Sequence, residues 1–297
     1  MTSLGSEDPS LFVLVGDIGA FGLRHFAAAY PGRFLNVGIR EQAMASAAAG
    51  LAATGFFPVI HSITGFVVER CFEQIKNDFC YSGLPGNIVS VGGGIDYAAM
   101  GCTHHSYSDL ALLKSLPGTQ VFCIGSPHEF DRLFRASYRS GSMIYFRLAD
   151  RAHGIAFRDE ELAVGRSISV RTGHELTLLT AGELLTSCLE VASEIGGDRC
   201  EVIYSPSIKP FDAARVRASV TKTRRLLVAE EHSVLGGLGD EARRALDNSG
   251  FAYALTSLGI QDQFLRDYGP RKHLLEVAGI GPARLLQEAR TLLERSP

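Results

Sequence analysis

Short runs of apolar and β-branched residues alternate with stretches whose apolar positions recur at helical spacing. Strands that alternate with helices in this way predict parallel sheets with helices on both faces. Several predicted strands are apolar at consecutive positions, as burial on both faces of a sheet requires. In the first half of the chain the predicted strands are 11–16, 57–61, 87–91, 120–124 and 143–147, and the predicted helices lie near 22–30, 40–54, 66–82, 108–116 and 127–140.

The pattern is interrupted at 148–166, a charged and glycine-containing segment without clear periodicity. A chain of 297 residues is long enough for two domains of roughly 150 residues each. We therefore predict an α/β fold of two doubly wound, mainly parallel-sheet domains, 1–150 and 167–297, joined by a linker at 151–166. In the second domain the predicted strands are 175–181, 201–204, 225–229 and 253–257, and the predicted helices lie near 184–195, 212–221, 238–248 and 282–294.

Composition narrows the classes of function. The formal charge of −3, without long runs of Lys or Arg, offers no basic surface for nucleic acid. No apolar run reaches the ~18 residues that span a bilayer, and the N-terminus lacks the basic and apolar regions of a secretory signal. The six cysteines include no C-x-x-C pair. We therefore expect a cytoplasmic protein with no nucleic-acid or membrane partner, buried thiols and no metal ligand of its own.

The segment 33–41, R-F-L-N-V-G-I-R-E, carries the first candidate for chemistry. It runs from a Pro-Gly turn through a short apolar stretch and a glycine to Glu41, which opens an alanine-rich helix at 41–53. A carboxylate at a helix N-terminus is ordinarily ionised and unremarkable. Because the flanks are almost wholly apolar, we predict that Glu41 is buried where its protonated form is favoured, so that it shares a proton with a ligand.

Two further segments stand out. In 63–77, Phe66 and Phe72 are six positions apart and lie on different faces of a helix, so either both are core residues or one faces a ligand or a partner chain. In 91–109, V-G-G-G-I-D-Y-A-A-M-G-C-T-H-H-S-Y-S-D, consecutive glycines free the backbone to approach a ligand. Its adjacent histidines cannot both point the same way, so at most one lines a site. A surface loop and a ligand-binding loop are both compatible with this pattern.

Together these segments resemble the transketolase family. The residues V-G-I-R-E-Q are similar to the family motif G-[IV]-x-E-Q, and the run from Phe66 to Asn77 is similar to F-x-x-x-R-x-x-E-Q-I-[RK]-N. The run G-C-T-H-H is similar to the end of G-x-x-x-x-x-x-D-G-x-[ST]-H. The resemblance implies thiamine diphosphate as cofactor, activated by Glu41, with catalytic His104 contacting the substrate carbonyl. It implies the following cofactor neighbours: Phe66, which stacks on the aminopyrimidine ring, Ile63, Arg70 and Asp17.

Departures from the family pattern fall at substrate positions. Met100 replaces an aspartate that binds a substrate hydroxyl in the family, and a thioether is only a weak acceptor. Gly92 stands where a histidine helps to hold the sugar phosphate, and Phe21 stands where a phosphate-binding serine is expected. A phosphate-binding arginine would fall at Asp150 or at Arg151, and both alignments remain open. These departures predict a substrate with fewer hydroxyl or phosphate groups than ordinary pentose phosphates.

The second half resembles the C-terminal domain of the same family through K-P-F-D at 209–212, E-E-H at 230–232 and G-G-L-G at 236–239. Taken by itself, a strand end followed by a glycine turn and a helix start indicates either an anion site or packing. The resemblance implies that this domain supports assembly and that His232 is structural.

The family's diphosphate-binding signature, G-D-G followed by an asparagine, does not occur in this sequence. The resemblance therefore implies a split transketolase whose N-terminal partner subunit carries the diphosphate site and the Mg²⁺ (or Ca²⁺) ligands. The family's two-fold assembly implies an α2β2 heterotetramer.

We predict a subunit that transfers a two-carbon ketol unit from a ketose or ketose phosphate to an aldehyde-type acceptor, in a specialised biosynthetic pathway. One alternative is the beta-type subunit of a 2-oxoacid dehydrogenase or acyl-transfer system, which passes the two-carbon unit to a lipoyl or carrier-protein thiol. Another is a non-catalytic subunit that stabilises an active partner.

Overall fold

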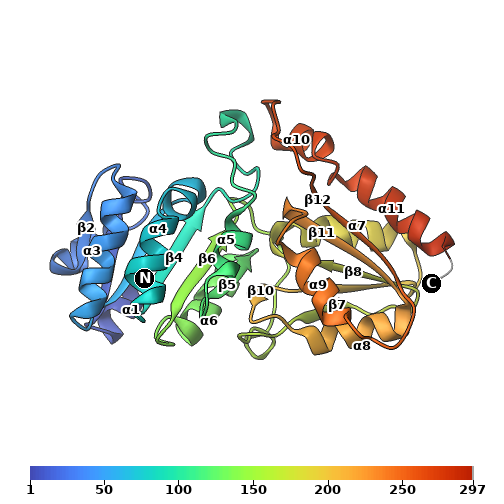
Figure 1. The fold of residues 1–297 in the computed structure, drawn as a ribbon, viewed down its shortest axis with the longest axis horizontal. Helices are drawn as coiled ribbons and strands as arrows, with labels where there is room; N and C mark the ends of the chain where they lie inside the picture. Colours follow the sequence, from blue (N-terminus) through green and yellow to red (C-terminus); the bar gives the residue numbers. More distant parts are fainter. Residues whose placement is uncertain (296–297) are drawn as a thin grey trace.

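The computed structural model describes residues 1–295, which form two sheets side by side along the long axis of the molecule (Figure 1). The first sheet has the strand order β10-β5-β6-β4-β3-β1-β2, and only β10 runs antiparallel to its neighbour. Its strands are β1 (Leu11–Val15), β2 (Phe34–Asn36), β3 (Phe57–Ile63), β4 (Gly86–Val91), β5 (Gln120–Ile124), β6 (Met143–Leu148) and β10 (Ser207–Lys209).

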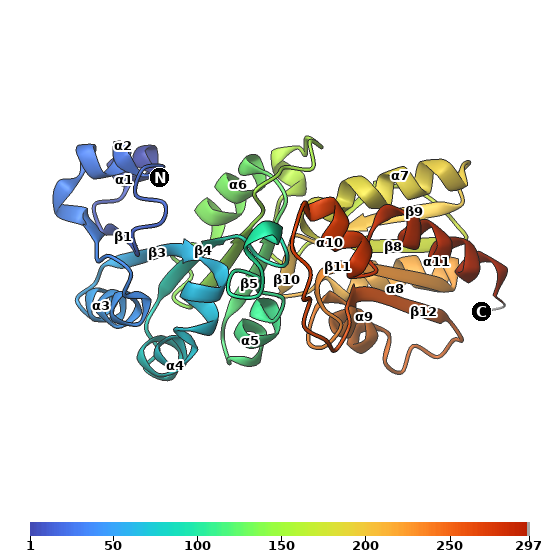
Figure 2. The ribbon, with the colours of Figure 1, turned by 90° about the horizontal axis from the view of Figure 1, so that it is seen from above.

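Helices cover both faces of the first sheet, as Figure 2 shows. Successive strand residues point to opposite faces. Leu14 accordingly joins the core shared with α3 and α5, whereas Val13 joins the core shared with α2 and α6. The helices are α1 (Thr2–Glu7), α2 (Arg24–Ala29), α3 (Glu41–Ala53), α4 (Phe72–Gln74), α5 (Asp109–Ser115) and α6 (Pro127–Ser137).

The segment predicted as one helix over 66–82 is wound differently. Two π-helical segments, Gly65–Glu69 and Ile75–Tyr81, flank the short α4. A π turn holds more residues than an α turn, so the side chains after it change face. Phe72 packs against the main core, while Phe66 is half-buried at the end of the sheet.

The second sheet has the order β12-β11-β8-β9-β7, with β7 antiparallel to β9 and the other pairs parallel. Its strands are β7 (Ile168–Arg171), β8 (Leu176–Thr180), β9 (Cys200–Tyr204), β11 (Arg225–Ser233) and β12 (Ala254–Ile260). The helices of this half are α7 (Leu185–Ile195), α8 (Ala213–Thr223), α9 (Leu238–Leu246), α10 (Arg271–Val277) and α11 (Pro282–Glu294). The predicted fold class, two mainly parallel α/β sheets, is confirmed.

The two halves share one core. Strand β10 comes after β9 of the second sheet in the sequence, but it pairs with β5 of the first sheet. One hydrophobic cluster runs from Leu14 in the first sheet to Val228 in the second. The sheets therefore hold a fixed relation, and loops from both halves can meet. Within residues 1–295, no helix has the length and apolar character needed to cross a membrane.

Candidate active site

The segments singled out in the first half meet at one edge of the first sheet. They follow β1, β2, β3 and β4, which are neighbours in the order β4-β3-β1-β2 and run parallel. The carboxyl ends of parallel strands meet at the same edge, where α/β proteins bind their ligands. The topology alone therefore gathers residues that are up to about a third of the chain apart.

Glu41 is the first residue of α3 and is 1% exposed. Arg70 Nη1 donates to its Oε2 at 2.7 Å. Its second oxygen, Oε1, is buried and has no hydrogen-bond partner among the described residues. Gly16 lies against it, because a Cβ there would sit 3.4 Å from Glu41 Cγ. A buried carboxylate oxygen without a partner costs free energy, and a ligand that donates a hydrogen bond would recover it.

Three side chains continue from Glu41 in an unbroken series of contacts. The Arg70 guanidinium carbon lies 4.5 Å from the centre of the Phe66 ring, a cation–π distance. The His104 ring meets the other end of the series, with its centre 5.2 Å from that of Phe66 at an interplanar angle of 66°. His104 Nδ1 lies 2.9 Å from Thr103 Oγ1. The site therefore contains a carboxylate, a cation, an aromatic face and an imidazole.

The remaining predicted cofactor neighbours flank this series. Ile63 is buried at the end of β3, directly before Thr64 and the π-helical segment that carries Phe66. Asp17 has φ 70 and is exposed, and its backbone N–H donates to Asn36 Oδ1 at 3.0 Å. Asn36 Nδ2 donates back to Asp17 Oδ1 at 3.3 Å, which joins the ends of β1 and β2.

The predicted substrate residues lie around the same edge or beside it. Met100 is 53% exposed and Phe21 is 78% exposed. Gly92 has φ 75, and a Cβ there would lie 2.1 Å from the Tyr97 ring, so a side chain at this position requires Tyr97 to move. Arg151 is exposed and lines a cavity of about 270 Å³ at the start of α6.

Two contributors to the site were not predicted from the sequence. The Tyr97 ring meets His104 edge-on, with ring centres 6.1 Å apart. Glu69 Oε1 accepts from the hydroxyls of Ser106 and Ser108 at 2.8 Å each, which fixes the end of the loop that carries His104. Both residues stand within the segments 63–77 and 91–109, but at positions that the motifs leave unspecified, so nothing in the sequence selects them. His105 is buried, and burial lowers its pKa, whereas His104 faces the site.

The E-E-H and G-G-L-G segments form a closed structure instead of an anion site. Glu230 accepts from the backbone N–H groups of Leu238 and Gly239 at 2.6 and 3.0 Å, which fills the N-terminus of α9. Burial raises the pKa of Glu230 to about 7. His232 donates from Nδ1 to Ser233 O and accepts at Nε2 from Ala111 N–H, and burial lowers its pKa to about 4. The packing interpretation of this motif is the one that the structure supports.

Family models match nearly the whole chain. The model described as transketolase, pyrimidine binding domain, matches residues 1–153, and the one described as transketolase, C-terminal domain, matches residues 165–285. The chain belongs to the transketolase family. The predicted family resemblance is therefore confirmed. The sheet edge at the carboxyl ends of β1 to β4, which we call the Glu41 edge, lies within the region that matches the pyrimidine-binding model.

Relatives named as transketolase subunits are similar over most of their own length. The 6-deoxy-6-sulfo-D-fructose transketolase subunit SqwH of Clostridium sp. (strain MSTE9) is 30% identical over 97% of this chain and 90% of its own. An apulose-4-phosphate transketolase subunit of Phocaeicola vulgatus is 30% identical over 80% of this chain and 78% of its own. The chain is therefore similar in extent to subunits of divided transketolases.

Solved structures agree with this extent. A structure described as a split gene transketolase, inactive beta4 tetramer, is 29% identical, covers 99% of this chain and 96% of its own, and has a TM-score of 0.83. The transketolase of Leishmania mexicana, at 20% identity, has the same TM-score of 0.83. This chain covers 44% of the Leishmania chain, so that likeness shows the fold alone.

Proposed function

We propose that the chain is the pyrimidine-binding subunit of a split transketolase that moves a two-carbon ketol unit from a ketose donor to an aldehyde-type acceptor. Its family depends on thiamine diphosphate. The observation that carries the proposal is the unpartnered Oε1 of Glu41, a buried acceptor at the edge where the family's pyrimidine-binding motif lies. The residues present fit the cofactor, because the unpartnered oxygen can share a proton with a ring nitrogen and so gain the hydrogen bond that it lacks.

Thiamine diphosphate, when bound, supplies the carbanion chemistry that forms and breaks the carbon–carbon bond. Glu41 holds a proton between its Oε1 and the pyrimidine N1′, while Arg70 fixes the orientation of the carboxylate through Oε2. Phe66 offers its ring for stacking. His104 donates to the substrate oxygen on which negative charge develops. Ile63 and Asp17 border the cofactor in this proposal.

A partner subunit completes the site. The chain has no G-D-G signature, so we assign the diphosphate and Mg²⁺ ligands to an N-terminal subunit, in an α2β2 heterotetramer. Large apolar side chains are exposed beside Glu41, which supports a protein surface there. They lie in β2 or in the segments that follow β1 and β2: Ile18, Phe21, Leu35 and Ile39.

The substrate is less hydroxylated or less phosphorylated than ordinary pentose phosphates. Met100 offers no strong acceptor for a hydroxyl group, and Phe21 and Gly92 offer no side-chain donor for a phosphate. Relatives of similar extent are named for unusual sugars, 6-deoxy-6-sulfo-D-fructose and apulose 4-phosphate. We place the enzyme in a specialised biosynthetic pathway on these grounds, with Arg151 as a candidate contact to the substrate.

The test is Glu41→Gln in the pair reconstituted with the N-terminal subunit. We expect ketol transfer to fall by at least about a hundredfold, as the loss of a proton-transfer group does. Calorimetry should show that the subunits still associate. Glu190→Gln, a change of an exposed glutamate on α7 outside every motif used above, is the matched control and should leave transfer unchanged. Retention of most activity in Glu41→Gln would overturn the proposal.

A further inference from the structure

The loop 92–106, which carries Met100 and His104, is contacted by a segment of the other half of the molecule. This segment, residues 261–277, leads from β12 through an irregular stretch into α10. The loop after β4 and α10 extend from the same side of the molecule in Figure 1, and they lie next to each other in Figure 2. Two sets of side-chain contacts join them.

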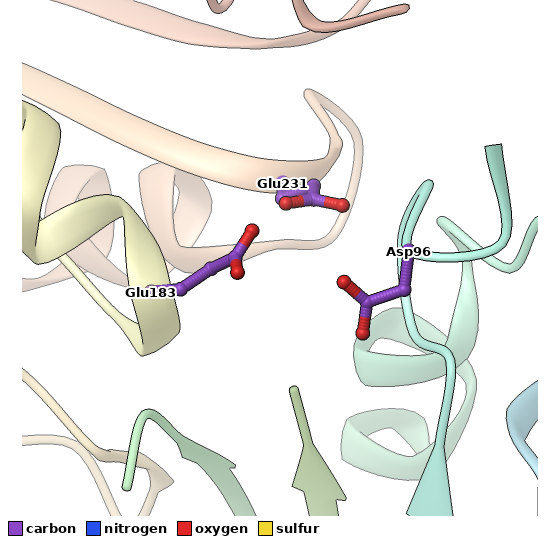
Figure 3. A group of neighbouring side chains, drawn as sticks. All are labelled: Asp96, Glu183 and Glu231. Atoms are coloured by element: carbon purple, nitrogen blue, oxygen red, sulfur yellow. The ribbon is translucent and has the colours of Figure 1, made fainter. Parts of the chain in front are cut away.

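The first set is a buried ionic cluster. Asp96, Glu183 and Glu231 bring carboxylate oxygens to within 4.8 Å of one another, from the 92–106 loop, the turn after β8 and strand β11 (Figure 3). Arg271, at the start of α10, pairs with Glu183 and Glu231, and its Nε lies 3.5 Å from Asp96 Oδ1. The backbone N–H of Ile95 donates to Glu231 Oε1 at 2.8 Å. One guanidinium therefore contacts carboxylates from both halves.

The positive charge in this cluster comes from Arg271. Three acidic groups this close repel one another unless a positive charge lies among them. The Arg271 guanidinium supplies that charge, because its Nη2 contacts two of the three carboxylates. Asp96 Oδ2 also accepts from the backbone N–H of Asp150 at 3.0 Å. Removal of Arg271 would therefore take away the charged group that joins Asp96 to the second half.

The second set of contacts reaches the backbone beside His104. Gly101 has φ 73, and a Cβ there would lie 2.0 Å from a ring carbon of Tyr268. The Tyr268 ring therefore packs directly on the loop backbone between Met100 and Cys102. The carbonyl oxygen of Gly101 accepts from the backbone N–H groups of His104 and His105 at 2.9 and 3.1 Å. The position of Gly101 thus fixes the turn that presents His104.

We propose that residues 261–277 are a positioning element for the 92–106 loop, with Arg271 and Tyr268 as its positioning residues. Arg271 holds the first part of the loop through Asp96, and Tyr268 holds the turn that carries Met100 and His104. The C-terminal half then acts on substrate recognition as well as on assembly. This inference rests on the proposed function only where it calls 92–106 the substrate loop.

The contact itself is tested on the full chain by hydrogen exchange of peptides that cover 92–106. Arg271→Met and Tyr268→Ala should each speed exchange in the loop by about tenfold, because a contact worth that factor is lost. Tyr268→Phe keeps the ring and Arg271→Lys keeps the charge, so both should stay closer to the unaltered protein. Arg284→Met, which removes a half-exposed ion pair with Glu288 on α11, is the control and should leave the loop unchanged.

Tyr268 is 64% exposed, so Tyr268→Ala tests the proposal even where Arg271→Met fails to fold. Unchanged loop exchange in Tyr268→Ala would overturn it. This outcome does not depend on the proposed function, because no substrate or cofactor is present in the measurement.

The consequence for the site is tested in the reconstituted pair. We expect Arg271→Met and Tyr268→Ala to raise the KM for the acceptor by about tenfold, with a smaller change in kcat and unchanged affinity for thiamine diphosphate, because a displaced loop misplaces substrate contacts. Arg271→Lys should restore part of the loss. A lower kcat with unchanged KM would show that the segment only stabilises the fold, and would overturn the positioning role. Failure of the unaltered pair to transfer ketol units at all would instead refute the proposed function.

Discussion

Two buried glutamates near helix starts, Glu41 and Glu129, have opposite surroundings. Glu129, in the first turn of α6, is fully buried and accepts from Gly125 N–H at 3.0 Å, from the Tyr204 hydroxyl at 2.7 Å and from His153 Nε2 at 2.5 Å. Glu41 is as deeply buried but has one partner, the half-exposed Arg70. Burial alone therefore does not distinguish these two carboxylates, whereas the unpartnered oxygen of Glu41 does.

The same contrast holds for the histidines of the two regions. His153 accepts at Nδ1 from Ile155 N–H and donates from Nε2 to Glu129, so both ring nitrogens have partners inside the chain. Within residues 1–295, only one ring nitrogen of His104, Nδ1, has a side-chain partner, which is the hydroxyl of Thr103. The Glu129 region joins the two halves, and the Glu41 edge keeps polar atoms available for a ligand.

The largest expected effect tests this contrast directly. Glu129→Ala should lower the free energy of unfolding by about 3–5 kcal/mol, because it leaves the donors of Tyr204, His153 and Gly125 buried without an acceptor. Glu41→Ala should change it by less than about 1 kcal/mol, since its single partner is partly solvated. Urea denaturation of the isolated chain, monitored by circular dichroism, measures both.

The exposed change Glu73→Ala serves as the control for these two variants and should leave the urea midpoint in place. Equal destabilisation by Glu41→Ala and Glu129→Ala would break the comparison, because it would mean that Glu41 is as fully integrated into the fold as Glu129.

A second expected effect concerns how stability depends on pH through two buried groups beside α9, His232 and Glu230. His232 has a pKa of about 4 in the folded chain, below its ordinary value of 6.5, so the unfolded chain takes up its proton first as the pH falls. The contribution of neutral His232 to stability is therefore lost as the pH falls from 6.5 towards 4. Glu230, with its pKa raised to about 7, contributes in the opposite direction, since its stabilisation is lost as the pH rises from 4.5 to 7.

His232→Gln should remove the first of these terms. At pH 5 the variant should gain about 2 kcal/mol relative to the unaltered chain, compared with the difference at pH 7.5, because each pH unit below 6.5 is worth about 1.4 kcal/mol. Urea unfolding at the two pH values measures this change. The isosteric variant Glu230→Gln should shift the pH profile in the other direction, and a parallel profile for both variants would show that neither group is titrated on unfolding.

Strands were predictable where their apolar runs are long and buried on both faces. The predicted strands 57–61 and 87–91 lie within β3 and β4 of the structure. Strands β2 and β10 have three residues each, too few for a period of two to show, and β10 lies at an edge. The predicted helix 66–82 was wrong in its winding, because a pattern of apolar positions cannot register the extra residue of a π turn.

The site was predictable to the extent that its residues lie in recognisable segments. The structure brings Glu41, Arg70, Phe66 and His104 into one series of contacts, although their roles stay proposals. The pairing of Arg271 with Asp96 could not be foreseen, because neither residue stands in a motif and their meeting depends on how the two sheets pack. Likewise, the lack of a hydrogen-bond partner at Glu41 Oε1 can be seen only in the structure, because it depends on where the neighbouring residues lie.

The smallest expected effect concerns the exposed loop beside the Glu41 edge and the selectivity for the acceptor. Met100 is 53% exposed on the loop that carries His104, so Met100→Asp should cost little stability while it adds a charged acceptor. For pairs of acceptor aldehydes that differ by one hydroxyl next to the carbonyl, we expect kcat/KM to shift about tenfold towards the hydroxylated member, the worth of one hydrogen bond to a charged group. Met100→Leu keeps an apolar side chain and should leave this ratio unchanged. An unchanged ratio in Met100→Asp as well would mean that position 100 does not contact the acceptor, and that recognition at this edge depends on groups of the partner subunit.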